Sequence, residues 1–313
     1  MRVIQNNFPI TVAAVEIITK GVNYTVRVTS NTTYYLKIFS PSRSPADLSF
    51  ELSVMDTLRA NNIGVATVVR SRQGAACVAI KLAGETRLAI LYNNVGGRPL
   101  TNNSADIFSY TSTLAELHNL PTTDISQRAP RILCLEKECS RIQKSLKSTS
   151  AIPAPMRSKI ARNCRSIQDQ ALHDCAVLCH GDAWLGNAKY ADGRVYFIDF
   201  EDALFANRNF DLGAMAYSLT ARDCNINPCI HWLLQGYNSR SATSATLNTI
   251  KPYIQLRSLA VCCFLLGHTR MDEQLIPTLL NRVEYFMGDK FEADIECMRA
   301  NEPCRNPHPF TKY

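Results

Sequence analysis

The spacing of apolar residues changes near residue 93 of this chain. Before that point, short β-branched and aromatic runs alternate with turn residues, which is typical of antiparallel strands. One helix is predicted among them, over residues 45–60, because Ser44 can cap its start and Pro45 suits its first position. The predicted strands lie at Val22–Val28, Tyr34–Phe39, Cys77–Lys81 and Arg87–Tyr92.

Beyond residue 93 the pattern becomes helical. A polar, glycine-containing break, Asn-Asn-Val-Gly-Gly, follows Tyr92, and apolar residues then recur at helical spacing from Ile107 to Leu117. Helix formers also dominate around 131–166 and 256–298. We therefore expect an α+β fold with two lobes. Residues 1–93 would form a nucleotide-binding lobe with an antiparallel sheet and one inserted helix, and residues 94–313 a larger, mainly helical lobe that carries the acceptor site.

Residues 176–199 predict a strand followed by a β-hairpin. An apolar run at 176–179 leads into His180-Gly181-Asp182, and Asp192-Gly193 is a strong two-residue turn signal between strands at 188–190 and 195–198. In such a hairpin residue 188 faces about residue 197. Asn187 and Asp199 should therefore emerge together at its open end.

These polar residues are suited to phosphoryl transfer. One amide and one carboxylate oxygen are sufficient protein ligands for Mg²⁺, which otherwise keeps water and phosphate oxygens. Asp182, five residues before Asn187, is then the candidate to orient a hydroxyl group and accept its proton. Each residue alone would be an ordinary turn or cap residue, but their combined spacing favours a functional site.

Lys37 and Glu51 form a second candidate pair. Lys37 lies within an apolar strand, where a cation is costly unless it is paired or faces a ligand. Glu51 falls on the apolar stripe of the predicted helix. A direct Lys37–Glu51 ion pair is therefore predicted, in which the glutamate orients the lysine toward the α- and β-phosphates of a nucleotide.

The segments HGDAWLGN, YFIDFED and NFDLGAM resemble the aminoglycoside phosphotransferase and choline kinase superfamily. The resemblance runs from Val15 to about Tyr217, and implies a bilobal protein-kinase-like fold and an ATP-dependent or GTP-dependent kinase that uses Mg²⁺. It also implies that His180 supports the catalytic loop and that Asp211 fixes the backbone of this loop. An N-cap role for Asp211 is the alternative, and both roles are compatible.

The same resemblance locates a nucleotide site in the N-terminal lobe. The turn containing Gly21 and Asn23 would cover the phosphates, although it keeps one glycine of the protein-kinase loop and an ordinary turn explains it nearly as well. Adenine would lie against the backbone around Leu91 and Asn93.

Composition narrows the setting of the protein. Hydrophobic residues make up 46% and charged residues 19%, which is typical of an ordered globular chain. We find no secretion signal and no run of ~18 uncharged apolar residues, so a cytoplasmic location without membrane contact is expected. The twelve cysteines should be reduced thiols, and no close pair has the spacing of a zinc knuckle. No nucleic-acid-binding motif accompanies the net charge of +7.

Three functions remain open, all on this fold. A small-molecule hydroxyl kinase is favoured over a Ser/Thr protein kinase of the bacterial stress-response type, and over a nucleotide-binding pseudokinase. The segment Arg128–Arg165 carries ten lysines and arginines against two acids. If these cations flank the acceptor site, they favour a neutral or anionic acceptor over an aminoglycoside; otherwise they form a solvated face.

Overall fold

A computed structural model describes residues 1–82, 84–121, 131–147, 152–170, 176–221, 229–267 and 275–299. The chain divides into two compact units. The first, which we call the sheet unit, comprises Met1–Leu100, Leu120–Arg131 and Leu185–Ala203. The second, the helical unit, comprises Thr101–Asn119, Ile132–Trp184 and Leu204–Tyr313. The mixed architecture confirms the α+β prediction, whereas a lobe boundary at residue 93 stays a prediction.

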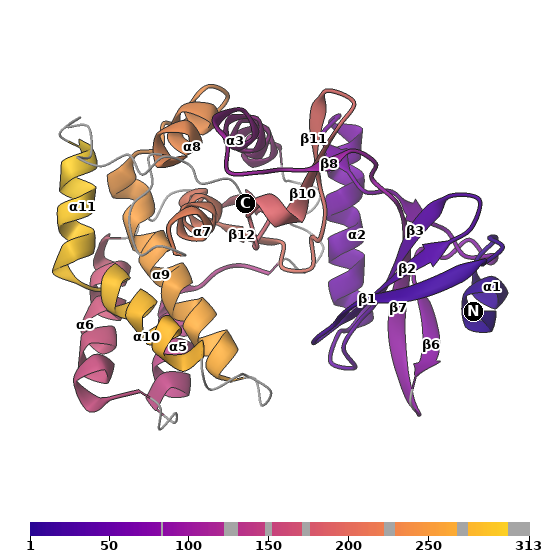
Figure 1. Ribbon diagram of the computed structural model, residues 1–313, viewed down its shortest axis with the longest axis horizontal. Coiled ribbons are helices and arrows are strands. Elements are labelled where there is room, and N and C mark those ends of the chain that lie inside the picture. Colours follow the sequence, from indigo (N-terminus) through magenta and orange to yellow (C-terminus); the bar gives the residue numbers. More distant parts are fainter. Residues whose placement is uncertain are drawn as a thin grey trace. The chain divides into compact units, whose positions relative to one another are not determined.

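An antiparallel sheet organises the sheet unit (Figure 1). Its strand order is β1-β2-β3-β7-β5, and β6 also pairs with β7. Side chains alternate between its faces: Ala89 and Leu91 join one apolar cluster with α1, whereas Ile90 joins another with α2. The elements are α1 (Arg2–Asn7), β1 (Ala14–Lys20), β2 (Tyr24–Thr29), β3 (Thr33–Ile38), α2 (Pro45–Ala60), β5 (Val68–Val69), β6 (Val78–Leu82) and β7 (Glu85–Asn93).

The start of helix α2 follows the predicted capping pattern. The Ser44 hydroxyl accepts a hydrogen bond from the Asp47 backbone N–H, and the Asp47 carboxylate accepts one from the Ser44 backbone N–H. This reciprocal capping box satisfies backbone donors that the first helical turn leaves open. It fixes where the helix begins, and so which of its residues face the sheet.

A second sheet in the same unit carries the predicted hairpin. Strands β10 (Ala188–Ala191) and β11 (Arg194–Phe197) pair with residue 188 opposite 197, as predicted. Asp192 and Gly193 both have positive φ, 49° and 78°, which matches the backbone of a tight two-residue hairpin turn. The outer strands of this sheet are β4 (Gly64–Val65) and β8 (Arg98–Pro99), in the order β4-β11-β10-β8.

The helical unit is built largely of packed helices (Figure 1). Among its described residues, a short antiparallel pair, β9 (Val177–Cys179) with β12 (Leu204–Ala206), precedes and supports the loop that starts at His180. Its helices are α3 (Ser104–His118), α5 (Leu135–Lys147), α6 (Ala154–Gln170), α7 (Asn209–Thr220), α8 (Cys229–Asn238), α9 (Leu247–Leu266), α10 (Leu275–Phe286) and α11 (Asp289–Arg299).

Within the described residues, one helix, α9, is long and apolar enough to cross a membrane by length and composition alone. More than half of its apolar window is buried inside the protein, against helices that include α7 and α10. It also carries Lys251 and Arg257, each of which pairs with a carboxylate of the helical unit. These features are typical of a core helix.

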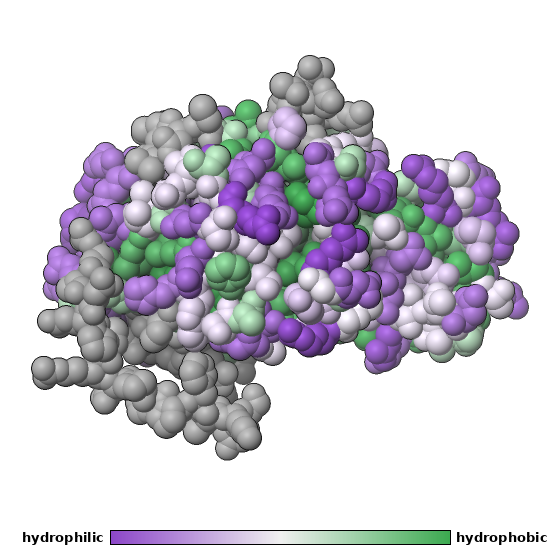
Figure 2. Space-filling model, turned by 90° about the horizontal axis from the view of Figure 1, so that it is seen from above, coloured by the Kyte–Doolittle hydropathy of each residue, from purple (hydrophilic) through white to green (hydrophobic). Residues whose placement is uncertain are grey.

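On the face shown in Figure 2, apolar patches are interrupted by polar side chains.

Candidate active site

The β10–β11 hairpin places two residues with oxygen-bearing side chains, Asn187 and Asp199, at its open end. After the pairing of residues 188 and 197, the Ile198 backbone N–H donates to the Asn187 carbonyl at 3.0 Å, which closes the open end of the hairpin. Asp199 follows with φ of 67°, a left-handed conformation that is uncommon for any residue except glycine. Such backbone strain is often found at functional sites.

Lys37 on β3 contacts the segment that follows the hairpin. Its ammonium nitrogen lies 2.6 Å from Asp199 Oδ1 and 2.7 Å from Glu201 Oε2. Burial lowers the pKa of Lys37, but the carboxylates of Asp199, Glu201 and Glu51 outweigh burial, so that this pKa lies above its ordinary value. The lysine is therefore charged at neutral pH.

Glu51 on α2 has different partners from the predicted one. Its side chain is 1% exposed, and it accepts hydrogen bonds from Arg43 Nη2 at 3.0 Å and from the Tyr92 hydroxyl at 3.1 Å. The predicted direct ion pair with Lys37 is replaced, because Arg43 reaches Glu51 from the loop before α2 while two other carboxylates hold Lys37. Burial raises the pKa of Glu51 despite both cations.

The turn between β1 and β2 is tied to the same cluster through Asn23. Its amide Nδ2 donates to Glu201 Oε2 at 2.6 Å, and its Oδ1 accepts from the Ser40 backbone N–H at 2.8 Å. The Gly21 backbone N–H bonds the Asn23 carbonyl. The turn is thus fixed by a side chain rather than by a glycine-rich sequence.

Leu91 and Asn93 lie within the sheet. Strand β7 runs between β3 and β5, and Leu91 is paired with Leu36 on one side and Val69 on the other. The Asn93 backbone N–H donates to the Thr67 carbonyl at 2.8 Å. Adenine contacts are predicted for the backbone around these two residues, and neighbouring strands lie on both sides of it. The geometry therefore adds no support to the predicted adenine contacts.

In the helical unit, Asp211 holds the backbone that leads to Asp182. Its buried carboxylate accepts from the His180 N–H at 2.6 Å and from the Gly181 N–H at 2.9 Å. Burial acts to raise the pKa of Asp211, but hydrogen bonds and the nearby histidines, His118 foremost, bring it below its ordinary value. Among the described residues, this carboxylate is therefore the charged anchor of the loop.

His118 extends this anchor, although sequence reasoning did not identify it. Its Nε2 lies 3.1 Å from Asp211 Oδ2, and its Nδ1 lies 2.8 Å from the Tyr237 hydroxyl. Its place at the end of the predicted helix around residues 107–117 was visible in the sequence, but its partners were not. His180 is also fully buried, and its Nδ1 accepts from the Asp182 backbone N–H at 3.4 Å.

The ligand atoms of His118, Cys179 and Asp211 lie within 4.8 Å of one another, which raises the question of a metal ion. Both histidine nitrogens and both Asp211 oxygens are already in hydrogen bonds, and Cys179 Sγ donates to the carbonyls of Ala206 and Asn207. The cluster is therefore explained as a buried hydrogen-bonded core. Cys175 and Cys224, each from a close cysteine pair, lie outside the described residues.

The Asp182 carboxylate has a partner that the sequence did not suggest. Arg257 Nη2, on α9, donates a hydrogen bond to Asp182 Oδ1. Both side chains are 28% exposed, so the pair is open to solvent and to ligands. The two residues are 75 positions apart, and no local pattern links them.

The sequence matches the family described as "Phosphotransferase enzyme family" over residues 15–228. The chain belongs to this family. It is therefore a phosphotransferase that acts on a hydroxyl group, as the superfamily resemblance indicated. The protein is also 24% identical over 266 residues to an uncharacterized protein of Deinococcus radiodurans, covering 82% of this chain and 78% of that protein.

Solved structures share the fold of this phosphotransferase. A microcompartment-associated aminopropanol kinase has a TM-score of 0.76 and 18% identity, with 96% of each chain covered. The amicoumacin kinase hAmiN, in complex with AMP-PNP and Ca²⁺, has a TM-score of 0.73 and 19% identity, with 94% of this chain and 93% of that chain covered. An ethanolamine kinase of Plasmodium vivax has a TM-score of 0.62 and 13% identity, with coverages of 90% and 84%. These likenesses support the protein-kinase-like fold.

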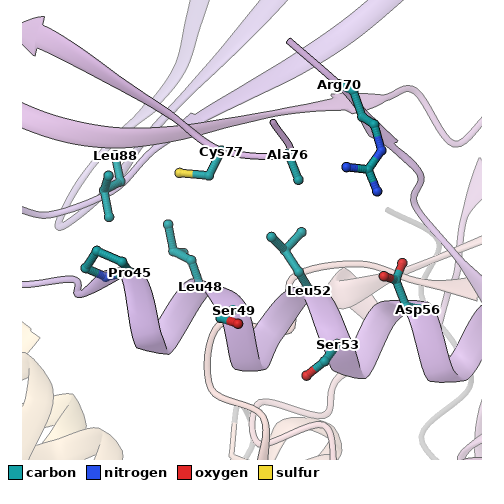
Figure 3. Close-up of a pocket in the computed structure, with 10 residues that line it drawn as sticks. All are labelled: Pro45, Leu48, Ser49, Leu52, Ser53, Asp56, Arg70, Ala76, Cys77 and Leu88. Carbon is teal, nitrogen blue, oxygen red and sulfur yellow. The ribbon is translucent and has the colours of Figure 1, made fainter. Parts of the chain in front are cut away.

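The sheet unit of the phosphotransferase also contains a cavity of about 320 Å³. Figure 3 shows Leu48 and Leu52 of α2 pointing across it toward Cys77 and Ala76. Its lining residues include neither Lys37 nor any of the candidate metal ligands. The cavity therefore gives no evidence about the phosphoryl-transfer site.

Proposed function

We propose that this phosphotransferase is an ATP-dependent, cytoplasmic kinase that phosphorylates a hydroxyl group of a small molecule. The observation that carries the proposal is the contact between Lys37 and Asp199, beside the hairpin end that also bears Asn187. A largely buried cation next to oxygen ligands is suited to the phosphates of a nucleotide and their metal ion.

The donor set fits a hard divalent cation. Asn187 offers an amide oxygen, and the Asp199 carboxylate is 39% exposed, which leaves it accessible. We assign these two side chains as the residues that would hold Mg²⁺. When bound, Mg²⁺ supplies positive charge that stabilises the transferring phosphoryl group.

Lys37 would bind the α- and β-phosphate oxygens. Its raised pKa keeps it protonated, and its contacts with Asp199 and Glu201 hold the ammonium group at the end of the hairpin. Glu51 would act at longer range, because its carboxylate favours the charged lysine without a direct bond. Asn23 and Gly21 would keep the β1–β2 turn in place near the phosphates.

Asp182 would orient the acceptor hydroxyl and take its proton as the oxygen attacks the γ-phosphorus and ADP leaves. Its loop is well suited to this positioning role. Asp211 fixes the two preceding backbone N–H groups, and His180 accepts the N–H of Asp182 itself. A rigid loop lowers the cost of orienting the carboxylate in the transition state.

A small-molecule acceptor is supported by the solved structures that share the fold. Their descriptions name kinases of aminopropanol, of amicoumacin and of ethanolamine. Each has a TM-score above 0.6. A protein acceptor remains an outcome of the test below.

The test incubates the purified chain with MgCl₂, ATP or GTP, and panels of hydroxylated metabolites, antibiotics and generic protein substrates. ADP release and ³¹P NMR of the product are measured, with Asp182→Asn as the inactive control. Acceptor-dependent ADP release is expected with a small molecule. Transfer only to protein would replace that assignment, and ADP release no faster than in the Asp182→Asn control would refute the kinase assignment.

A further inference from the structure

We infer that Arg257 and Arg282 bind an anionic group on the acceptor, so that the substrate of this kinase is an acidic alcohol. The anionic group is a carboxylate or a phosphate. The inference rests on the proposed function, because it places the acceptor beside Asp182. It concerns the helical unit alone, in which all the residues of the argument lie.

Arg257 is the first element of the site. Its hydrogen bond to Asp182 uses one of the five N–H donors of the guanidinium group. The remaining donors match the planar oxygen pair of a carboxylate or the oxygens of a phosphate. Because the side chain is 28% exposed, a ligand can reach these donors.

Arg282 on α10 is the second element. Its Nε is buried and has no hydrogen-bond partner among the described residues. Both Arg257 and Arg282 act on the buried Tyr217 hydroxyl, where their charges oppose the rise in the pKa of Tyr217 that burial causes. Arg282 of α10 hydrogen-bonds the Tyr217 side chain of α7, and Arg257 of α9 lies near enough for its charge to act on the same hydroxyl.

The charge balance favours an anion over a cation. Asp182 is the only carboxylate that pairs with either arginine within the described part of the chain. An acceptor with an ammonium group beside its hydroxyl would meet an excess of positive charge there. An anionic group would instead compensate that excess on binding.

The Arg257–Asp182 contact also suggests how binding prepares the acceptor. In the structure, Arg257 occupies Asp182 Oδ1. An anionic group that takes over the guanidinium leaves this oxygen able to accept the hydrogen bond of the acceptor hydroxyl. Recognition of the anion and orientation of the hydroxyl are then coupled through one arginine.

This inference does not depend on the basic segment Arg128–Arg165. Three of its described cations pair with carboxylates at the surface, namely Arg131 with Asp47, Arg141 with Glu138 and Lys159 with Glu284. Arg128 lies outside the described residues. Because these three cations already have carboxylate partners, the charge of the acceptor is better argued from Arg257.

The test uses four-carbon alcohols that differ in one terminal group: 4-hydroxybutanoate, 4-hydroxybutyl phosphate, 1,4-butanediol and 4-aminobutan-1-ol. Binding is measured by the fluorescence of Trp184, which follows Asp182 by two residues and is 45% exposed. Replacing the other tryptophan, by Trp232→Phe, makes the fluorescence specific to Trp184. Each alcohol is titrated into this Trp232→Phe parent and into its Arg257→Gln, Arg257→Lys and Arg282→Gln variants.

One of the two acids should bind at least about tenfold more tightly than the diol, and the amino alcohol most weakly. Arg257→Gln should remove that preference, and Arg257→Lys should restore part of it. The matched control is Lys251→Gln, which removes one positive charge from the same helix but pairs with Glu292 rather than Asp182. It should retain the preference.

The inference is overturned if neither acid gives a saturable response in the parent, if the diol or amino alcohol binds as tightly, or if the Arg257→Gln and Arg282→Gln variants keep the preference. The more tightly bound acid identifies carboxylate or phosphate as the anionic group. Failure of the proposed function looks different: the acid binds in an Arg257-dependent way, yet no acceptor in the kinase panel releases ADP above the Asp182→Asn control.

Discussion

The Lys37 ammonium group contacts Asp199 at 2.6 Å, although the helix that carries Glu51 packs against the same sheet. The lysine thus pairs with the carboxylate that we assign to the metal ion. Glu51 in turn is neutralised by Arg43. Asp199 therefore pairs with Lys37, and Glu51 pairs with Arg43. We expect substitutions in the first pair to affect catalysis and substitutions in the second pair to affect stability.

Removing Asp182 or Asp199 should lower kcat by at least ~10²-fold, because one positions the hydroxyl and the other supplies charge for the metal ion. Asp182→Ala should leave nucleotide affinity nearly unchanged, whereas Asp199→Ala should raise the Mg²⁺ concentration needed for half-maximal activity. Steady-state kinetics over a Mg²⁺ series measure both. A variant that keeps more than about half of the parent turnover would show that its residue is not part of the catalytic machinery.

Arg43 and Glu51 should be strongly coupled in stability. Glu51 is fully buried, so removing its cation leaves an uncompensated charge, and Arg43→Gln should destabilise the fold by ~3 kcal/mol. In a double-mutant cycle, Arg43→Gln and Glu51→Gln should be non-additive in urea unfolding. Lys37→Ala with Glu51→Gln serves as the comparison, and its coupling should be smaller because these residues share no direct bond. Equal coupling in both cycles would contradict the structure.

Local patterns were enough to predict the hairpin and the start of α2. The Asp192-Gly193 turn fixes the strand register within a few residues, and the Ser44 cap fixes the phase of the helix, which correctly buries Glu51. Both signals act over short stretches of chain. The positions of Asn187 and Glu51 within their elements therefore follow from the sequence.

The ion-pair partners were not predictable in the same way. Arg43 lies in a loop, where no periodicity reveals the direction of a side chain. It forms the ion pair with Glu51 that was predicted for Lys37. Arg257 reaches Asp182 only because α9 packs within the helical unit. Partners separated by long stretches of chain depend on tertiary packing, which single-sequence patterns do not contain.

Asp211 should make stability depend on acid pH. Its pKa lies below the ordinary value of 3.8, so its contribution is fully present above pH 3.8 and is lost as the pH falls through the folded-state pKa. The stability difference between the parent and Asp211→Asn should be constant above about pH 5 and narrow below 3.8, since a protonated Asp211 resembles asparagine. Urea unfolding at several pH values measures this. The exposed Asp56→Asn is the control, and a difference that does not change with pH would exclude the charged anchor.

Gly213→Ala should destabilise the protein, although alanine is the better helix former. A Cβ at Gly213 on α7 would lie 2.6 Å from the Tyr253 carbonyl carbon and 2.8 Å from the Ile254 nitrogen on α9, and backbone atoms cannot rotate away. Helix propensity alone predicts a gain of up to ~1 kcal/mol, whereas overpacking predicts a net loss of ~1–3 kcal/mol. The sign of the change in the urea midpoint therefore decides between them. Gly96→Ala, where a Cβ meets no atom within 4 Å, should be nearly neutral.

The Gly213→Ala substitution should also lower kcat. Because α7 carries Asp211, a separation of α7 from α9 should disturb the Asp182 loop, so that kcat and stability fall together. A stabilised Gly213→Ala variant would show that the two helices are not in this close contact.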